Sequence, residues 1–189
     1  MAVQGVEDFD EVVLYGGRGH SEMIVMVLQG LWQDRVQLRA VVDDLDHGFI
    51  HPTLNVPVIS GAERLERFAQ VPVLVSMGDG RVRARIAARL ADEGAVLATA
   101  LHRRPGHVAS NLQVGPGCIV DPAAPVSPNV VLGTGVQVLA RVIGHDVTVG
   151  DFATLAVGSI LNGHITVGAF ASIGSGAIIC NGRPGRPLQ

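Results

Sequence analysis

Aliphatic residues recur at every sixth position in the second half of the chain. They are Val108, Val114, Val120, Val126, Leu132 and Val138, and after one residue is dropped the series resumes at Ile143, Val149, Leu155, Leu161, Val167, Ile173 and Ile179. A second small or apolar residue follows four places later in most repeats: Leu112, Cys118, Ala124, Val130, Val136, Val147, Ala153, Ile165, Ala171 and Ala177. Helices and ordinary strands have periods of 3.6 and 2, so neither explains a period of six. The pattern predicts a coil in which each hexad supplies one short strand and one tight turn, and in which two inward side chains stack on the neighbouring coils.

The composition agrees with a coil of this kind. Hydrophobic residues make up 48% of the 189 residues, which excludes wholesale disorder, whereas aromatic residues make up only 4% and 24 residues are glycine. These values predict a core of small aliphatic side chains and many turns.

The first hundred residues follow a different pattern, in which apolar runs alternate with amphipathic stretches. The runs at 12–15, 40–43 and 73–76 are expected to be buried strands, and the stretches at 23–31, 63–69 and 81–94 are expected to be helices, the last one ending at Gly94. Strands that alternate with helices predict a small, doubly wound, Rossmann-like parallel sheet. We therefore expect an α/β domain over 1–101, the coil over 102–182 and a tail over 183–189.

Charge and composition exclude several classes of function. The net charge of −3 provides no basic field for nucleic acid. The chain has no lysine, which excludes a Schiff-base lysine and a P-loop. No targeting peptide or membrane-spanning run is evident, so we expect a soluble, cytoplasmic protein. Cys118 and Cys180 are expected to be packing residues, and neither a disulfide nor a metal site is predicted.

His145 and Asp146 interrupt an otherwise aliphatic repeat. They occupy the third and fourth places of their hexad, which are not the inward places, so both side chains are expected to point outward. Imidazole titrates near neutral pH and suits a general base, and a neighbouring carboxylate would orient the ring or favour its charged form. The alternative is a pair of solvated turn residues.

The stretch Tyr15–His20, with the sequence YGGRGH, lies between a predicted strand and a predicted helix. Backbone amides and a helix N-terminus at such a place form a phosphate site. The spacing is not that of the dinucleotide fingerprint, because position 22 is Glu. Asp43 ends the second strand, where an acceptor for a ribose or base is expected. The alternative is a tight turn followed by a solvated acidic loop.

The whole chain resembles a known family. The segments LYGGRGHSE, VVDDLD, VSMGDGRVRARI and IGHDVTVGDFATLAVGSILNGHITVGAFASIGSGAII appear in the same order as the motifs of the hexapeptide-repeat acyltransferases. The resemblance is to the branch with UDP-4-amino-sugar N-acetyltransferases and sialic acid O-acetyltransferases. It implies a left-handed parallel β-helix, a homotrimer, acetyl-CoA as co-substrate, no metal, and transfer of acetyl to an amino group or hydroxyl of a nucleotide-activated sugar in bacterial surface glycan synthesis.

The resemblance also implies roles for particular residues. His145 matches the general base and Asp146 its acidic partner. Gly163 matches a glycine whose amide faces the acetyl group, and Thr154 and His164 fall at positions of the acetyl-CoA site. The nucleotide sugar would be held by the turn after the first strand and by the acidic pair after the second, which are Gly16, Gly17, Arg18, Gly19, His20, Asp43 and Asp44.

The sequence departs from the family pattern in four places. The hexad before His145 is one residue short, and Leu139 or Ala140 stands where the family commonly has Asn. Gly144 replaces a residue that is often acidic, Thr154 replaces a His, and the repeat ends at NGRPGRPLQ. These departures motivate two alternatives to the sugar acetyltransferase. One is a sugar-nucleotide-binding scaffold with an impaired coil, and the other is an acetyltransferase for a small nonsugar acceptor.

Overall fold

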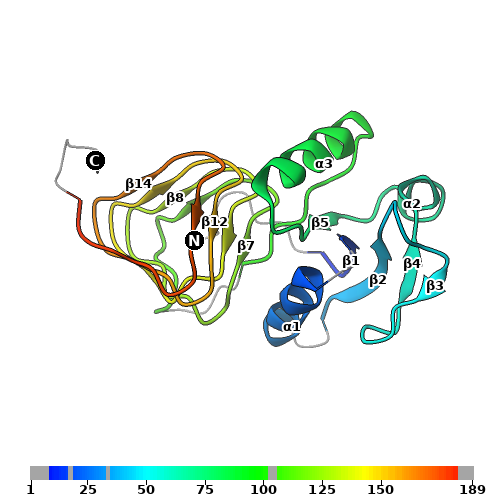
Figure 1. The fold of residues 1–189 in the computed structure, drawn as a ribbon, viewed down its shortest axis with the longest axis horizontal. Coiled ribbons are helices and arrows are strands. Elements are labelled where there is room, and N and C mark those ends of the chain that lie inside the picture. The colour runs from blue at the N-terminus through cyan, green and yellow to red at the C-terminus, as the bar shows by residue number, and fades with distance from the viewer. Residues whose placement is uncertain (1–8, 17–18, 33–34, 102–105, 183–189) are drawn as a thin grey trace. The chain divides into compact units, whose positions relative to one another are not determined.

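The chain folds into two compact units, one that ends at Ala98 and one that begins at Thr99. The structure is a computed structural model, and it describes residues 9–16, 19–32, 35–101 and 106–182. Figure 1 shows an α/β unit built from the N-terminal segment and a coil of stacked turns built from the C-terminal segment. The two patterns in the sequence therefore correspond to two different architectures.

The N-terminal unit is built on a five-stranded sheet with the order β3-β4-β2-β1-β5. Its strands are β1 (Glu11–Tyr15), β2 (Gln37–Val42), β3 (Phe49–Ile50), β4 (Pro57–Ile59) and β5 (Val73–Val75). Its helices are α1 (His20–Trp32), α2 (Gly61–Phe68) and α3 (Gly80–Asp92), with α1 on one side of the sheet and α2 and α3 on the other (Figure 1). This arrangement confirms the doubly wound sheet. The expected sheet was too small, however, because the short strands β3 and β4 were not predicted and β3 pairs antiparallel with β4.

Local sequence signals fix the helix ends. The side chains of Ser60 and Asp79 cap α2 and α3, accepting hydrogen bonds from first-turn amides. Gly94 has a φ of +72°, which confirms it as the glycine that terminates α3. Arg83 is one of the arginines of α3. It is buried and donates to the carbonyl oxygens of Met77 and Gly78, both at 2.9 Å.

The coil consists of three parallel faces of two-residue strands. One face has the order β10-β13-β16, the second β14-β11-β8-β6 and the third β15-β12-β9-β7. The strands are β6 (Gln113–Val114), β7 (Ile119–Val120), β8 (Val131–Leu132), β9 (Gln137–Val138), β10 (Val142–Ile143), β11 (Thr148–Val149), β12 (Thr154–Leu155), β13 (Ile160–Leu161), β14 (Thr166–Val167), β15 (Ser172–Ile173) and β16 (Ile178–Ile179). This confirms the left-handed parallel β-helix, in which three hexads complete one turn.

The missing residue changes the register without breaking the coil. Ile143 pairs with Leu161, eighteen positions later, whereas Val138 pairs with Leu155, seventeen positions later. The residue is lost between β9 and β10, where Leu139 and Ala140 are both buried. The shortened corner is thus a packed corner, and the strands on either side of it keep their pairing.

The predicted inward residues form the core of the coil. Both series of repeat positions contribute, and Val120, Val138, Ile143, Val147 and Leu155 have no exposed surface. Cys118 is buried as expected, but Cys180 is exposed because it occupies an outward place of its hexad. No helix in the described parts of the chain has the length and apolar character needed to cross a membrane.

Candidate functional site

The dipeptide of His145 and Asp146 lies at a corner where successive coils stack their turns. Because the register is seventeen or eighteen residues, this corner collects five dipeptides, which we call the His145 corner: 110–111, 128–129, 145–146, 163–164 and 181–182. The second residue of the central three, Asn129, Asp146 and His164, has a left-handed backbone with φ of 61°, 58° and 58°. That conformation is uncommon outside glycine, and here it sets the direction of three polar side chains.

His145 and Asp146 form an exposed pair. Nδ1 of His145 lies 2.7 Å from Oδ2 of Asp146, and the two side chains are 53% and 37% exposed. The hydrogen bond from His145, followed by one from Asn129, lowers the pKa of Asp146 below its usual range. An ionised carboxylate only accepts hydrogen bonds, so Nδ1 of His145 is assigned the hydrogen. In the neutral ring, Nε2 then has a lone pair that can accept a proton. This is the tautomer that a general base needs.

Asn129 holds the second oxygen of Asp146 and was not predicted from the sequence. Its Nδ2 donates to Oδ1 of Asp146 at 2.8 Å, while Asn111 in the preceding coil donates to Oδ1 of Asn129. The backbone amide of Asn129 in turn donates to Oδ1 of Asn111 at 3.1 Å. The carboxylate is therefore fixed by a ladder of two asparagines. A search for polar residues at the equivalent place of earlier coils would have found both.

His164 stands beside the pair, one coil later. Its Nδ1 lies 3.6 Å from Oδ2 of Asp146, and its ring meets the ring of His145 edge to face with centroids 4.9 Å apart. One ligand atom from each of His145, Asp146 and His164 lies within 4.8 Å of the others. Among the described residues, these three form the one group of His, Cys, Asp or Glu side chains that could hold a metal ion.

Gly163 forms the floor beneath the His145 ring. A Cβ at this position would lie 2.7 Å from Cε1 and 2.8 Å from Nε2 of His145, so only glycine allows the ring to rest there. The amide of Gly163 donates to Oδ1 of Asn181 at 3.0 Å. The donor that we expect to face an acetyl group thus holds a side-chain carbonyl oxygen in this structure.

Thr154 is not brought to the His145 corner within one chain. It lies on β12, in the face β15-β12-β9-β7, whereas the corner joins β10 and β13 to β11 and β14. The coil therefore assembles His145, Asp146, Gly163 and His164 at one corner, and it places Thr154 on another face.

The turn predicted to hold phosphates follows β1 at the carboxyl edge of the sheet. Gly16 has a φ of +124°, and its amide donates to the carbonyl of Val42 at the end of β2. Gly19 precedes α1, and His20 is its first residue. The turn and the residues after β2 therefore lie at the same edge, as expected for neighbouring parallel strands. Gly17 and Arg18 lie outside the described residues.

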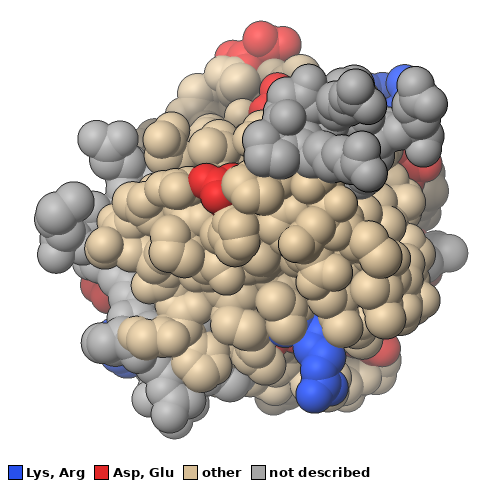
Figure 2. Space-filling model, turned by 90° about the vertical axis from the view of Figure 1, so that its left-hand side faces the viewer, with Lys and Arg blue, Asp and Glu red and all other residues tan. Residues whose placement is uncertain are grey.

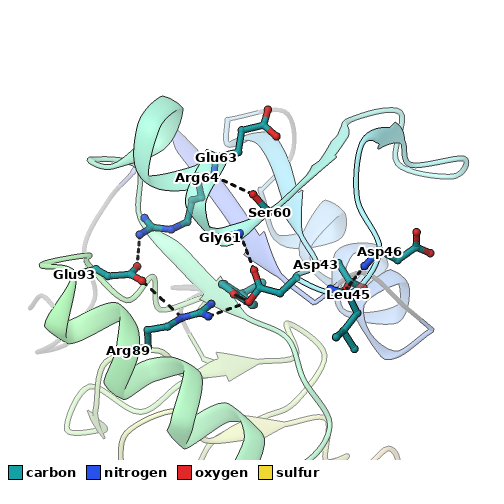
Figure 3. A network of polar contacts seen from close by, with 11 residues as sticks. Asp43, Leu45, Asp46, Ser60, Gly61, Glu63, Arg64, Arg89 and Glu93 are labelled. Carbon is teal, nitrogen blue, oxygen red and sulfur yellow. Dashed lines mark hydrogen bonds and ion pairs between the residues drawn. The ribbon is translucent and has the colours of Figure 1, made fainter.

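Asp43 and Asp44 have different surroundings, and Figure 3 shows Asp43 with Leu45 and Asp46. Asp43 accepts hydrogen bonds from the amides of Leu45 and Asp46 through Oδ1, which forms a tight turn. Asp44 is anchored from three sides. Its Oδ1 accepts from the amide of Gly61 at 2.8 Å, and its Oδ2 accepts from the Tyr15 hydroxyl and from Arg89.

The network around Asp44 continues into α2 and α3. Arg89 also stands over the Tyr15 ring at 5.0 Å and lies 3.7 Å from Glu93, and Glu93 pairs with Arg64. The Arg64 side chain is buried, and its Nε and Nη1 have no hydrogen-bond partner. The sequence did not predict that Asp44 would be part of a structural ion-pair network.

The chain is similar to several known proteins. It is 30% identical to a GDP-perosamine N-acetyltransferase of Escherichia coli O157:H7 over 149 residues, which cover 74% of the chain and 66% of the relative. The chain thus spans just under two thirds of that relative's length. No protein-family model matches it.

Solved structures share the fold over nearly the whole chain. WeeI from Acinetobacter baumannii AYE superposes with a TM-score of 0.79 at 23% identity, covering 94% of the chain and 84% of that protein. The acetyltransferase domain of PglB from Neisseria gonorrhoeae FA1090, solved with acetyl coenzyme A, gives 0.69 at 23%, covering 94% and 95%. PerB from Caulobacter crescentus, solved with CoA and GDP-perosamine, gives 0.67 at 24%, covering 95% and 90%. These likenesses show that the chain has the fold of the solved acetyltransferases, and the relative at 30% identity is a GDP-perosamine N-acetyltransferase.

Proposed function

We propose that the protein transfers the acetyl group of acetyl-CoA to the amino group of a nucleotide-linked sugar, with His145 as the general base. The observation that carries the proposal is the hydrogen bond between His145 Nδ1 and Asp146, because in the neutral ring it makes Nε2, at an exposed corner, the nitrogen without a proton. The relatives support the substrates, since one is named for GDP-perosamine and two solved neighbours hold acetyl-CoA or CoA.

The transfer is direct and needs one proton acceptor. The sugar amine attacks the thioester carbonyl carbon, and Nε2 of His145 takes the proton that the nitrogen loses. The imidazolium is stabilised by the ionised Asp146 at Nδ1. When the tetrahedral intermediate collapses, the C–S bond breaks and the proton passes from Nε2 to the departing sulfur of CoA. Most of the rate then comes from holding the two substrates in line beside a prepositioned base.

Gly163 would supply the donor for the oxyanion. A backbone amide beside the base is suited to stabilise the negative charge that develops on the thioester oxygen. The carbonyl oxygen of Asn181 accepts from this amide at 3.0 Å, which shows that an acceptor oxygen fits at that position. The acetyl carbonyl would take the place of the Asn181 side chain when acetyl-CoA binds.

The acetyl-CoA site is proposed to form between subunits of a homotrimer. Thr154 lies on a different face from His145, and a neighbouring chain would bring its Thr154 to the acetyl-CoA molecule that His145 meets. The outward side chains of β10, β13 and β16 are Val142, Ile160 and Ile178, and Ile178 is 62% exposed. Figure 2 shows one side of the molecule, on which charged side chains are few among the described residues.

The nucleotide is proposed to bind at the carboxyl edge of the N-terminal sheet. The turn with Gly16 and Gly19 would hold the diphosphate, with Gly17, Arg18 and His20 beside it. Asp43 would accept from the ribose or base, whereas Asp44 would act by holding the start of α2 in place through Gly61. We place this enzyme in the synthesis of bacterial surface glycans and in the cytoplasm, where nucleotide sugars are made.

The test is turnover with acetyl-CoA and a panel of GDP-, UDP- and dTDP-linked 4-amino sugars, followed by chromatography of both products. His145→Ala should reduce turnover by about 10²–10⁴-fold, the usual contribution of general base catalysis. The matched control is His107→Ala, which removes the other described histidine of the coil, outside the His145 corner.

Other outcomes separate the alternatives. Turnover with a small amine but with no nucleotide sugar would indicate a nonsugar acceptor. No turnover with any acceptor, together with no CoA binding by calorimetry, would indicate a sugar-nucleotide-binding scaffold. A monomer in light scattering would contradict the intersubunit acetyl-CoA site.

A further inference from the structure

We propose that the His145 corner binds a divalent transition-metal ion, with Zn²⁺ as the probe, through Nδ1 of His145, Oδ2 of Asp146 and Nδ1 of His164. The ion inhibits acetyl transfer by His145 and is not a cofactor of the reaction. That Zn²⁺ binds follows from the geometry alone, whereas the inhibition rests on the proposed function.

One ligand atom from each of the three residues lies within 4.8 Å of the others. Oδ2 of Asp146 lies 2.7 Å from Nδ1 of His145 and 3.6 Å from Nδ1 of His164. Ligands of tetrahedral Zn²⁺ stand about 3.3 Å apart, given metal–ligand distances of about 2.0–2.2 Å. The first distance must therefore open by about 0.6 Å and the second must close by about 0.3 Å. Two imidazoles and one carboxylate form a donor set that suits Zn²⁺, Cu²⁺ and Ni²⁺.

The corner also holds the ligands in place and leaves them accessible. Asn129 binds Oδ1 of Asp146, so Oδ2 is the oxygen turned toward both rings. The left-handed backbone of Asp146 and His164 fixes where the two side chains start. The three side chains are between 36% and 53% exposed, so an ion can reach them from solvent and keep a water molecule in its fourth position.

A bound ion would select the wrong tautomer of His145. In the tautomer described above, the N–H at Nδ1 donates a hydrogen bond to Asp146, and Nε2 is the basic nitrogen. An ion on Nδ1 needs the electron pair of that nitrogen, so the single proton of the neutral ring must move to Nε2. A His145 ring protonated at Nε2 cannot accept the proton of the sugar amine. The ion also takes the carboxylate oxygen that would stabilise the imidazolium.

The binding experiment uses the full chain with Cys180→Ser, because the exposed thiol is a competing ligand. Calorimetry with Zn²⁺ and the visible absorption of bound Co²⁺ report the site. We expect one ion per chain, at least tenfold weaker Zn²⁺ binding in His164→Asn and in Asp146→Asn, and unchanged binding in the matched control His107→Asn. Asn tolerates the left-handed backbone, so both site variants should fold, which circular dichroism checks.

Zn²⁺ binding of equal strength in His164→Asn and in the parent chain would overturn the site, and so would a parent chain that binds no ion.

The inhibition is measured by the loss of acetyl-CoA on a chromatogram, because Zn²⁺ binds the free thiol of CoA and would disturb an assay of that thiol. A saturating ion should stop turnover, and a chelator should restore it. If the protein shows no acetyl transfer at all, the proposed function fails while calorimetry and Co²⁺ absorption still decide the site. Full turnover with the ion bound would overturn the inhibition.

Discussion

The two units of the molecule place their polar residues in different ways. At the His145 corner, polar side chains come together because a fixed register returns the chain to the same corner after seventeen or eighteen residues. In the N-terminal unit, Asp44 meets Arg89 across forty-five positions with no repeat to indicate it. The coil therefore builds an exposed site from neighbours that can be counted in the sequence. The α/β unit uses the same residue types to hold its helices together, and only tertiary packing determines which ones meet.

The strongest test of this difference is the floor under the His145 ring. Gly163→Ala adds a Cβ within 2.8 Å of two ring atoms, so the ring must move and turnover should fall by at least about 100-fold. Gly168→Ala in the same coil is the control, because a Cβ there meets nothing within 4 Å. Equal turnover in the two variants would show that the position of the ring does not matter for acetyl transfer.

The effect of removing a member of the asparagine ladder should decrease with its distance from Asp146. Asn129→Gly removes a hydrogen bond to a charged group, keeps the left-handed backbone unstrained, and should reduce kcat by about tenfold with little change in thermal stability. Asn111→Ala, one coil further away, should have a smaller effect. If the order of the two effects is reversed, the ladder does not act through Asp146.

The ion-pair network of the N-terminal unit should respond in stability instead. Asp44→Asn weakens the contacts with Tyr15 and Arg89, so we expect the free energy of unfolding to fall by about 1–2 kcal/mol. The far-UV helix signal reports this unit, because the helices of the described chain all lie in it. Asp92→Asn, an exposed change at the end of α3, is the control, and an equal loss in both variants would contradict the structural role of Asp44.

Arg64 should contribute little despite its burial. The guanidinium pairs with Glu93, but Nε and Nη1 are buried without partners. We expect Arg64→Met to keep the free energy of unfolding within about 1 kcal/mol or to raise it, since a buried charge with unpaired donors is costly and Glu93, which is 20% exposed, keeps Arg89 at 3.7 Å. A loss of several kcal/mol in urea unfolding would show that the ion pair outweighs this cost.

The smallest expected effect is a dependence of the free energy of unfolding on pH, which both units should show. Hydrogen bonds lower the pKa of Asp146 in the coil, and amides of Val82 and Arg81 lower the pKa of Asp79 at the start of α3. Both contributions to stability are therefore present above the unfolded pKa of about 4 and are lost as the pH falls through the lower folded pKa. The stability difference between the parent chain and Asp79→Asn or Asp146→Asn should shrink between pH 5 and pH values below about 3. A difference that does not change with pH would contradict the carboxylate's role.

The sequence predicted the coil more completely than it predicted the site. The inward aliphatic positions and the outward His145 and Asp146 follow from the period alone, because each hexad place always faces the same way. Asn129 was missed although it lies seventeen positions before Asp146 and could have been found by counting across the short corner. The strands β3 and β4 are two and three residues long and carry no periodic signal. The surroundings of Asp44 depend on where α3 packs, which no local pattern in the sequence specifies.

The left-handed backbone at Asn129, Asp146 and His164 lowers the stability of the folded protein. Each of these residues spends free energy of about 1 kcal/mol or more on a shape that glycine would adopt without penalty. Selection for heat resistance alone would therefore favour glycine at this corner, but every such replacement would delete a polar side chain on which the proposed acetyl transfer depends. If that proposal holds, the corner keeps three strained residues because the reaction requires their side chains.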